Sequence, residues 1–253
     1  MEAAAGRGGP AAQQDVSSAM QTGDADAGPP PPTWGIAPFF VERRLGGPAW
    51  QGDGFAFRAP TTGRNALRVL RALQLRKPIL LEGSPGVGKT SLVAAMAKAL
   101  GQELVRLNLS EQTDMMDLLG ADLPVEGGAP GEFAWVDGPL LHAIKSGAWV
   151  LLDELNLAGQ TVLEGLNAVL DHRAELFIPE LDATFRCPPT FRIFGAQNPV
   201  QEGGGRKGLP RSFLNRFTRV HVELLTGEDL HFIAGESRRV SLPWDVTEWR
   251  GWL

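Results

Sequence analysis

The sequence contains almost no cysteine and no long apolar run, and each absence excludes a class of protein. Its single cysteine, Cys187, cannot form a disulfide within the chain, so a disulfide framework is excluded and a reducing compartment is expected. No apolar run approaches the ~18 residues that a membrane-spanning helix requires. The N-terminus lacks a basic segment followed by an apolar one, so we predict neither membrane insertion nor secretion.

An excess of basic residues is also lacking. The 253 residues include 24 Lys and Arg against 29 Asp and Glu, which gives a formal net charge of −5. This balance argues against a globally basic nucleic-acid binder, although the basic stretch at residues 206–219 leaves a local contact open. Hydrophobic residues make up 43% of the chain and charged residues 21%, which is enough apolar material for a packed core.

The composition changes along the chain and predicts four segments. Residues 1–33 are rich in Ala, Gly, Pro and Gln, so they bury too little apolar surface to offset the entropy of ordering and are predicted to be a disordered tail. Residues 34–60 are predicted to be an extension that packs on the next domain. Residues 61–230 show helical and strand patterns and are predicted to form the core domain. Residues 231–253 lack convincing periodicity and are predicted to be an irregular tail.

The most informative motif is G-x-x-x-x-G-K-[ST] at residues 83–90. It follows a short apolar run typical of a buried parallel strand and precedes residues 91–100, which are rich in good helix formers. In this context backbone N–H groups and a helix N-terminus cradle phosphates. The residues predicted to bind nucleotide are Gly83, Ser84, Pro85, Gly86, Val87, Gly88, Lys89, Thr90 and Ser91. Lys89 would reach the β- and γ-phosphates and Thr90 would be a ligand of Mg²⁺, so ATP and Mg²⁺ are the expected cofactors.

Two acids form the second motif. Asp153 and Glu154 end the apolar run at residues 148–152. Ligands of open α/β sheets lie at the carboxyl ends of the strands, where the phosphate loop also lies. Asp153 is therefore predicted to hold the hydration shell of Mg²⁺, and Glu154 to activate a water. The alternative is a pair of surface acids at a strand end, and their position after a phosphate loop favours the functional interpretation.

A third polar position follows the apolar strand at residues 191–196. Asn198 would reach the γ-phosphate or the attacking water, or it is a turn residue before Pro199. The other expected elements are strands at 103–109 and 219–224, a hairpin at 175–186, helices at 61–73, 138–147 and 162–170, and a loop-like insertion at 122–138. Together they predict an α/β P-loop NTPase with three αβα layers and a parallel central sheet.

The order of these motifs resembles the AAA+ ATPases. The stretches GSPGVGKT, GEFAWVDGPLLHAIKSGAWVLLDELN and GGGRKGLPRSFLNRF resemble more specifically the midasin family, dynein-related ATPases with tandem AAA modules on one chain. The match covers roughly residues 55–230. It implies that residues 83–90 are the Walker A loop, that Asp153 and Glu154 are the Walker B acids with Glu154 as catalytic base, and that Asn198 is sensor 1.

Further expectations rest on the resemblance alone. It implies that Arg216, with Arg211 as fallback, is an arginine finger acting on the nucleotide of a neighbouring module. It implies neighbouring AAA+ modules or protomers in a ring, pre-60S ribosomal particles and assembly factors as partners, and a nuclear location. The short apolar runs and the acidic net charge, by contrast, are the reasons to expect no membrane and no sequence-specific nucleic acid as partners. The helical lid of the family is not recognisable after the core, so we expect it to be missing or truncated and the isolated module to be a weak or inactive ATPase.

Three other functions stay open. The missing lid is typical of a nucleotide-binding interaction module without turnover, for which ATP would bind without being hydrolysed. A MoxR-type AAA+ chaperone has the same motif order. A DNA-acting AAA+ motor is suggested by residues 206–219, and salt-sensitive DNA binding would support it.

Overall fold

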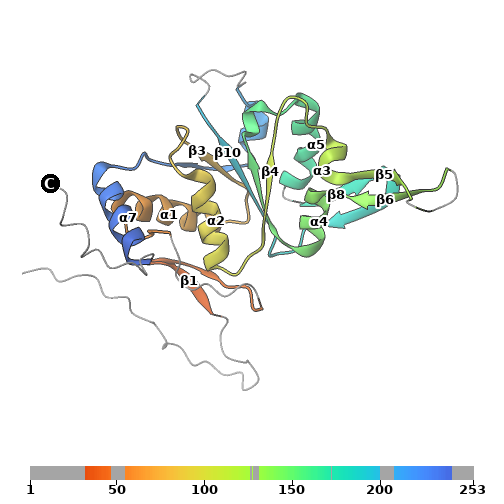
Figure 1. Ribbon diagram of the computed structural model, residues 1–253. Helices are drawn as coiled ribbons and strands as arrows, with labels where there is room; N and C mark the ends of the chain where they lie inside the picture. Colours follow the sequence, from red (N-terminus) through yellow and green to blue (C-terminus); the bar gives the residue numbers. More distant parts are fainter. Residues whose placement is uncertain are drawn as a thin grey trace, which may run out of the picture. The chain divides into compact units, whose positions relative to one another are not determined.

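A parallel five-stranded sheet forms the centre of the described chain (Figure 1). The computed structural model describes residues 32–46, 55–125, 127, 131–171, 173–199 and 208–240. The strands of the central sheet are β3 (Ile79–Glu82), β4 (Leu104–Asn108), β7 (Trp149–Asp153), β10 (Arg192–Gln197) and β11 (Thr218–His221). Their order is β11-β3-β10-β7-β4, and every neighbouring pair is parallel. The parallel sheet predicted from the sequence is confirmed.

Helices cover both faces of this sheet (Figure 1). The principal ones are α1 (Pro60–Leu73), α2 (Lys89–Ala99), α4 (Pro139–Ser146) and α5 (Gln160–Leu170). Leu81 and Leu151 pack in the core cluster that contains α1 and α2, whereas Leu80 and Leu152 pack in the cluster that contains α4 and α5. Successive strand residues therefore serve opposite cores, because side chains alternate along a strand. The result is the three-layer αβα fold.

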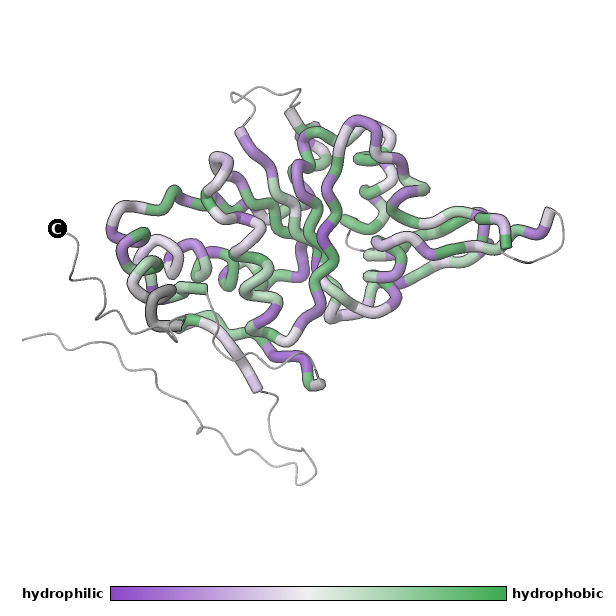
Figure 2. The backbone as a smooth tube through the Cα atoms, viewed as in Figure 1, coloured by the Kyte–Doolittle hydropathy of each residue, from purple (hydrophilic) through white to green (hydrophobic). Residues whose placement is uncertain are grey.

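Burial on both faces explains the apolar composition of the central strands. All five residues of β7 are buried, and so are the first three of β3. A parallel strand covered on both sides reads as a continuous apolar run, and Figure 2 shows hydrophobic residues along the central strands. The first polar residues after these runs lie at the carboxyl edge of the sheet, where the phosphate loop begins.

Two antiparallel hairpins extend from the α4–α5 side. The first is formed by β5 (Gly120–Pro124) and β6 (Phe133–Asp137) after the short helix α3 (Met115–Leu119), and the second by β8 (Glu175–Ile178) and β9 (Ala183–Arg186) with the 3₁₀ turn η2 (Pro179–Leu181). The hairpin predicted at 175–186 is confirmed. The loop-like assignment of 122–138 was wrong for residues 122–124 and 133–137, which pair as parts of β5 and β6. The Gly- and Pro-rich residues between the two strands dominate the composition of the segment.

A third hairpin, β1 (Thr33–Ile36) with β2 (Phe39–Glu42), precedes the core. Four of its apolar side chains, Trp34, Ile36, Phe39 and Val41, pack against the core cluster that contains α1 and α2. The backbone N–H of Arg44 then donates to the carbonyl of Leu100 at the end of α2 (2.9 Å). The disordered tail predicted at residues 1–33 lies outside the described residues, except for its last two.

The chain continues as a helix after the core. The short α6 (Arg211–Leu214) precedes β11, and α7 (Gly227–Val240) follows it. The irregular tail predicted for residues 231–253 was therefore wrong for residues 231–240, and residues 241–253 lie outside the described part. No helix within that part combines the length and the apolar character needed to cross a membrane.

One buried carboxylate joins α7 to α1. Asp229 is fully buried and accepts hydrogen bonds from the backbone N–H of Thr61 (2.7 Å) and from both the N–H and the hydroxyl of Thr226 (2.7 Å each). It thereby satisfies N–H groups at the first turns of two helices. Burial alone would raise the pKa of Asp229, but these hydrogen bonds from Thr226 and Thr61 hold it well below its ordinary value.

Replacing Asp229 with Ala is expected to lower the free energy of unfolding by about 1–3 kcal/mol, because buried donors lose a charged acceptor. A group with a depressed folded-state pKa contributes stability above its unfolded-state pKa and loses it in acid. The difference between parent and variant is therefore expected to shrink as the pH falls below about 4. Urea denaturation at several pH values measures this, with exposed Glu228→Ala in the same helical turn as control. Equal losses for both variants would contradict the assignment.

Candidate nucleotide-binding site

The loop between β3 and α2 has the geometry of an anion cradle. Gly86 and Gly88 have φ angles of 78° and 83°, a region that residues with side chains rarely adopt. Gly83 allows a close approach, since a Cβ there would lie 2.7 Å from the carbonyl oxygen of Val222. Val87 is buried and anchors the loop in the core, while α2 begins at Lys89 directly after Gly88. The N-terminus of α2 thus opens onto the loop, as phosphate binding requires.

Lys89 is buried inside this loop. Its ammonium donates to the carbonyl oxygens of Gly83 (2.7 Å) and Ser84 (2.9 Å) and to Oδ1 of Asn198 (2.7 Å). Only 7% of the residue is exposed. A buried cation with oxygen partners on three sides is held at the centre of the cradle, where a phosphate would replace part of these contacts.

Asn198 connects the lysine to the candidate base. Its amide nitrogen donates to Oε1 of Glu154 (2.7 Å), while its amide oxygen accepts from Lys89. This follows from topology, because β10 lies between β3 and β7 and the residue after β10 therefore lies between the loop and the acids. Asn156, which sequence reasoning missed, is buried and donates to the backbone carbonyl of Asn198 (3.0 Å), which fixes its position.

The backbone of Glu154 is also unusual. It has φ 53° and ψ 42°, the left-handed region, directly after β7 and before the 3₁₀ turn η1 (Leu155–Leu157). A non-glycine residue in this conformation is strained, and such strain concentrates at functional sites. The turn directs the chain away from the sheet at this carboxylate, which contacts Asn198.

The candidate metal ligands lie next to each other. The Thr90 hydroxyl donates to Oδ2 of Asp153 (3.0 Å), and Asp153 is 9% exposed at the end of β7. Hydroxyl and carboxylate oxygens are the donors that Mg²⁺ prefers, so these residues fit a magnesium ion. The described residues hold no group of three or more His, Cys, Asp or Glu placed around a metal.

Arg106 is a second residue that sequence reasoning missed. Its guanidinium donates to Oδ2 of Asp153 through Nη2 (2.6 Å) and Nε (3.1 Å). The alternating pattern of residues 103–109 predicted a strand, but only the pairing of β4 with β7 brings this arginine to the acid. The signal in the sequence was an arginine near the carboxyl end of a core strand.

The remaining candidate residues are exposed or make other contacts. The Nε of Arg216 donates to Oδ1 of Asn167 in α5 (2.8 Å), and its Nη1 is 4.0 Å from the carboxylate of Asp171. Arg211 is exposed in α6, and Ser91 is exposed in the first turn of α2. The structure thus brings together the lysine, the acids and Asn198, and ties Arg216 to α5.

The single cysteine offers no further reactive group. Burial raises the pKa of Cys187 to about 11, so its thiol stays protonated at neutral pH. It follows β9, where its backbone N–H donates to the carbonyl of Ala174 (2.8 Å). We assign it a packing role against the core cluster that contains α4 and α5.

This fold and this site define an AAA-type P-loop NTPase. Residues 78–217 match the family model described as "AAA domain (dynein-related subfamily)", and the chain belongs to that family. The fold also resembles a crystal structure of a candidate ATPase from Cytophaga hutchinsonii. That likeness has a TM-score of 0.55 at 24% identity and covers 74% of this chain and 52% of the other, so it supports the fold alone.

Within the AAA family, the sequence is similar to particular relatives. It is 61% identical to midasin from Dictyostelium discoideum over 202 residues and 60% identical to midasin from Giardia intestinalis over 179 residues. These matches cover 79% and 71% of this chain but only 3% and 4% of the two midasins. An uncharacterized protein of Staphylococcus aureus is 33% identical over 165 residues, which are 64% of this chain and 61% of that protein. The chain is thus similar to one AAA module of midasin.

Proposed function

We propose that the chain binds Mg·ATP and hydrolyses it to ADP and phosphate when a neighbouring AAA+ module or protomer completes its site. The observation that supports this most directly is the hydrogen-bonded chain from Lys89 through Asn198 to Glu154. In this proposal Lys89 is the cation that binds phosphate, Asn198 is the polar sensor and Glu154 is the base, and hydrogen bonds connect the three side chains. Asp153 and Thr90 adjoin this chain with the oxygen donors that Mg²⁺ takes.

Each side chain has a distinct role in this mechanism. Lys89 and the backbone N–H groups of the loop bind the β- and γ-phosphates and stabilise the charge that develops on them. Glu154 orients the attacking water and accepts its proton, and Asn198 holds that carboxylate at a fixed position. Bound Mg²⁺ would supply further positive charge to the phosphates, held by Thr90 and Asp153.

A second candidate function is nucleotide binding without turnover. The engagement of Arg216 with Asn167 favours it, because the guanidinium is bonded to α5 of its own chain. An arginine finger contributes ~10³–10⁵ in rate, so a site without one turns over very slowly. The chain would then bind ATP as part of a larger assembly.

The similarity to midasin supports a specific setting for the proposal. We infer that the module works in a ring of AAA modules that remodels pre-60S ribosomal particles and their assembly factors in the nucleus. A MoxR-type chaperone role uses the same site on a different substrate. Binding of pre-60S material, and not of unrelated complexes, would separate the two.

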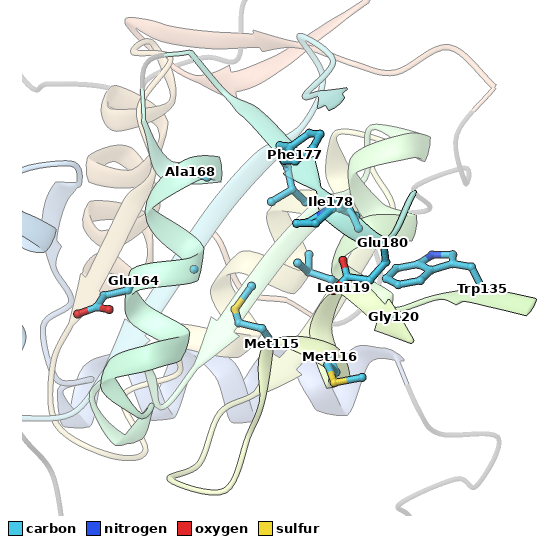
Figure 3. Close-up of a pocket in the computed structure, with 13 residues that line it drawn as sticks. Met115, Met116, Leu119, Gly120, Trp135, Glu164, Ala168, Phe177, Ile178 and Glu180 are labelled. Atoms are coloured by element: carbon cyan, nitrogen blue, oxygen red, sulfur yellow. The ribbon is translucent and has the colours of Figure 1, made fainter. Parts of the chain in front are cut away.

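An apolar surface on the two hairpins supports contact with a protein partner. A pocket of about 340 Å³ lies among side chains of α3, α5, β6 and β8 (Figure 3). Its apolar lining includes Met115, Met116, Leu119, Trp135, Phe177 and Ile178. Met116 is 60% exposed and Phe177 is 54% exposed, and such gathered apolar surface commonly marks a protein interaction site. The site for nucleotide and this surface lie on different elements of the domain.

The test is ATP hydrolysis by the purified chain as a function of its concentration, with Glu154→Gln as the blank. We expect the rate per molecule to rise with concentration, because protomers would complete each other's sites. We expect Glu154→Gln to bind ATP with nearly the affinity of the parent and to lose at least ~100-fold in rate, as removal of a general base does.

Three outcomes would contradict the proposal. Turnover by Glu154→Gln equal to that of the parent would remove the base assignment. ATP binding by the parent with no turnover above that of a protein-free reaction at any concentration would leave the chain a nucleotide-binding module. Absence of ATP binding would overturn both candidate functions.

A further inference from the structure

Arg106 lies within reach of the candidate metal ligand because of strand register. On the edge strand β4, Asn108 is paired with Asp153 of β7, and Arg106 is paired with Leu151. Side chains two residues apart in a strand share a face, so Arg106 lies diagonally across from Asp153 on that face. The arginine side chain is 58% exposed, whereas that of Asp153 is only 12% exposed.

The oxygen that Arg106 contacts is the one next to Thr90. Oδ2 of Asp153 accepts from Nη2 of Arg106 (2.6 Å), from Nε of Arg106 (3.1 Å) and from the Thr90 hydroxyl (3.0 Å). Oδ1 accepts the backbone N–H of Glu154 (3.1 Å). In this state the guanidinium therefore occupies the oxygen that would serve a metal held between Thr90 and Asp153.

A buried carboxylate and an exposed guanidinium make an asymmetric pair. The carboxylate requires a counter-charge because desolvation disfavours an unpaired ion. The arginine can return to water, because its side chain is exposed at the sheet edge. A guanidinium and a divalent cation cannot share one carboxylate oxygen without strong repulsion at this distance.

We propose that Arg106 is a positioning residue that holds Asp153 in place of the metal and leaves Oδ2 when magnesium enters with nucleotide. The arginine keeps the carboxylate oriented and neutralised between turnovers, and it raises the magnesium concentration at which the site fills. This inference rests on the proposed nucleotide function and concerns the same site.

The test compares metal affinity with stability in Arg106→Met, a substitution of similar length without charge. Mn²⁺ is titrated into protein with a substoichiometric amount of ADP, and free Mn²⁺ is read by electron paramagnetic resonance. We expect the Kd for Mn²⁺ to fall about tenfold, while ADP affinity in EDTA stays unchanged. We expect the melting temperature of the nucleotide-free protein in EDTA to fall by about 2–4 °C, because Asp153 loses its counter-charge, and this deficit to vanish in saturating Mg²⁺ and ADP.

Two variants calibrate this result. Arg219→Met removes an exposed arginine from the opposite edge strand β11, where its guanidinium is 4.0 Å from Glu82, and is expected to leave the Kd for Mn²⁺ unchanged. Arg106→Lys keeps the charge but loses the two hydrogen bonds through Nη2 and Nε. Its Kd for Mn²⁺ is expected to lie between those of the parent and Arg106→Met.

The outcomes separate this inference from the proposed function. If the parent binds ADP and Arg106→Met binds Mn²⁺ no more tightly than the parent does, Arg106 does not hold Asp153 in place of the metal. The proposed function would remain intact. An equal gain in metal affinity in Arg219→Met would also overturn this role of Arg106, because the effect would then be one of overall charge. Failure of the parent to bind ADP would overturn both.

Discussion

Replacing Lys89 with Met is expected to reduce ATP affinity at least ~100-fold, which corresponds to about 2.7 kcal/mol. Its ammonium lies within 2.9 Å of two loop carbonyls and of Asn198, so it is already positioned at the centre of the cradle. Charge-assisted hydrogen bonds to phosphate are roughly twice as strong as neutral ones. Met fills similar space without donating a hydrogen bond, so the loss of ATP affinity measures the contribution of the Lys89 ammonium. Equilibrium dialysis with labelled ATP measures it.

The matched control is Lys98→Met. Lys98 lies in the last turn of the same helix, α2, and is exposed. This variant carries the same change in charge and is expected to bind ATP within about twofold of the parent, since an exposed charge about two and a half helical turns away is largely screened. Circular dichroism establishes that both variants fold. Similar ATP affinities for folded Lys89→Met and Lys98→Met would rule out the loop as the nucleotide site.

The second large effect is expected from mixing two inactive variants. Arg216→Ala removes the proposed finger, and Glu154→Gln removes the proposed base. Arg216→Ala alone is expected to lose ~10³-fold or more in ATP turnover, the range for an arginine finger, and Glu154→Gln alone at least ~100-fold, as for loss of a general base. In a mixture, an intact Glu154 in one protomer is completed by an intact Arg216 from its neighbour. We therefore expect turnover to reappear on mixing and to rise with total protein concentration.

Arg211→Ala is the control for this experiment. Arg211 is exposed in α6, shortly before Arg216 in the chain, and is the alternative finger. If Arg216 is the finger, Arg211→Ala stays active alone. Recovery of activity only from Arg211→Ala mixed with Glu154→Gln would transfer the role to Arg211. Full activity of Arg216→Ala alone would show that its contact with Asn167 is structural.

The sequence predicted the parts of the site that local pattern determines. The phosphate loop requires glycines at Gly86 and Gly88 because of their positive φ angles, and those glycines are visible in the motif. Apolar runs located the strands, since a strand buried on both faces has no polar interruption. The residues that end those runs, Asp153 and Asn198, lie together because the strands are parallel neighbours.

What the sequence did not predict depends on contacts between distant segments. The pairing of Arg106 with Asp153 requires the register of β4 against β7, which no local pattern encodes. The hairpin of β5 and β6 was missed because its Gly- and Pro-rich tip outweighs two short strands. Residues 231–240 of helix α7 were predicted to be an irregular tail, because the stability of this helix comes from packing and capping against α1 rather than from clear periodicity.

The connection between α1 and the segment after β11 also has a mechanical consequence. Asp229 bonds to the first turn of α1, and Asn65 in the next turn exchanges two hydrogen bonds with the backbone of Glu223 (3.0 Å each). Arg68, one turn further, forms an ion pair with the Glu223 carboxylate. Three successive turns of α1 are thus bonded to the segment from Glu223 to Asp229. Because α1 immediately precedes β3 and the phosphate loop in the order of elements, we expect a displacement of α7 to be transmitted through α1 towards the phosphate loop.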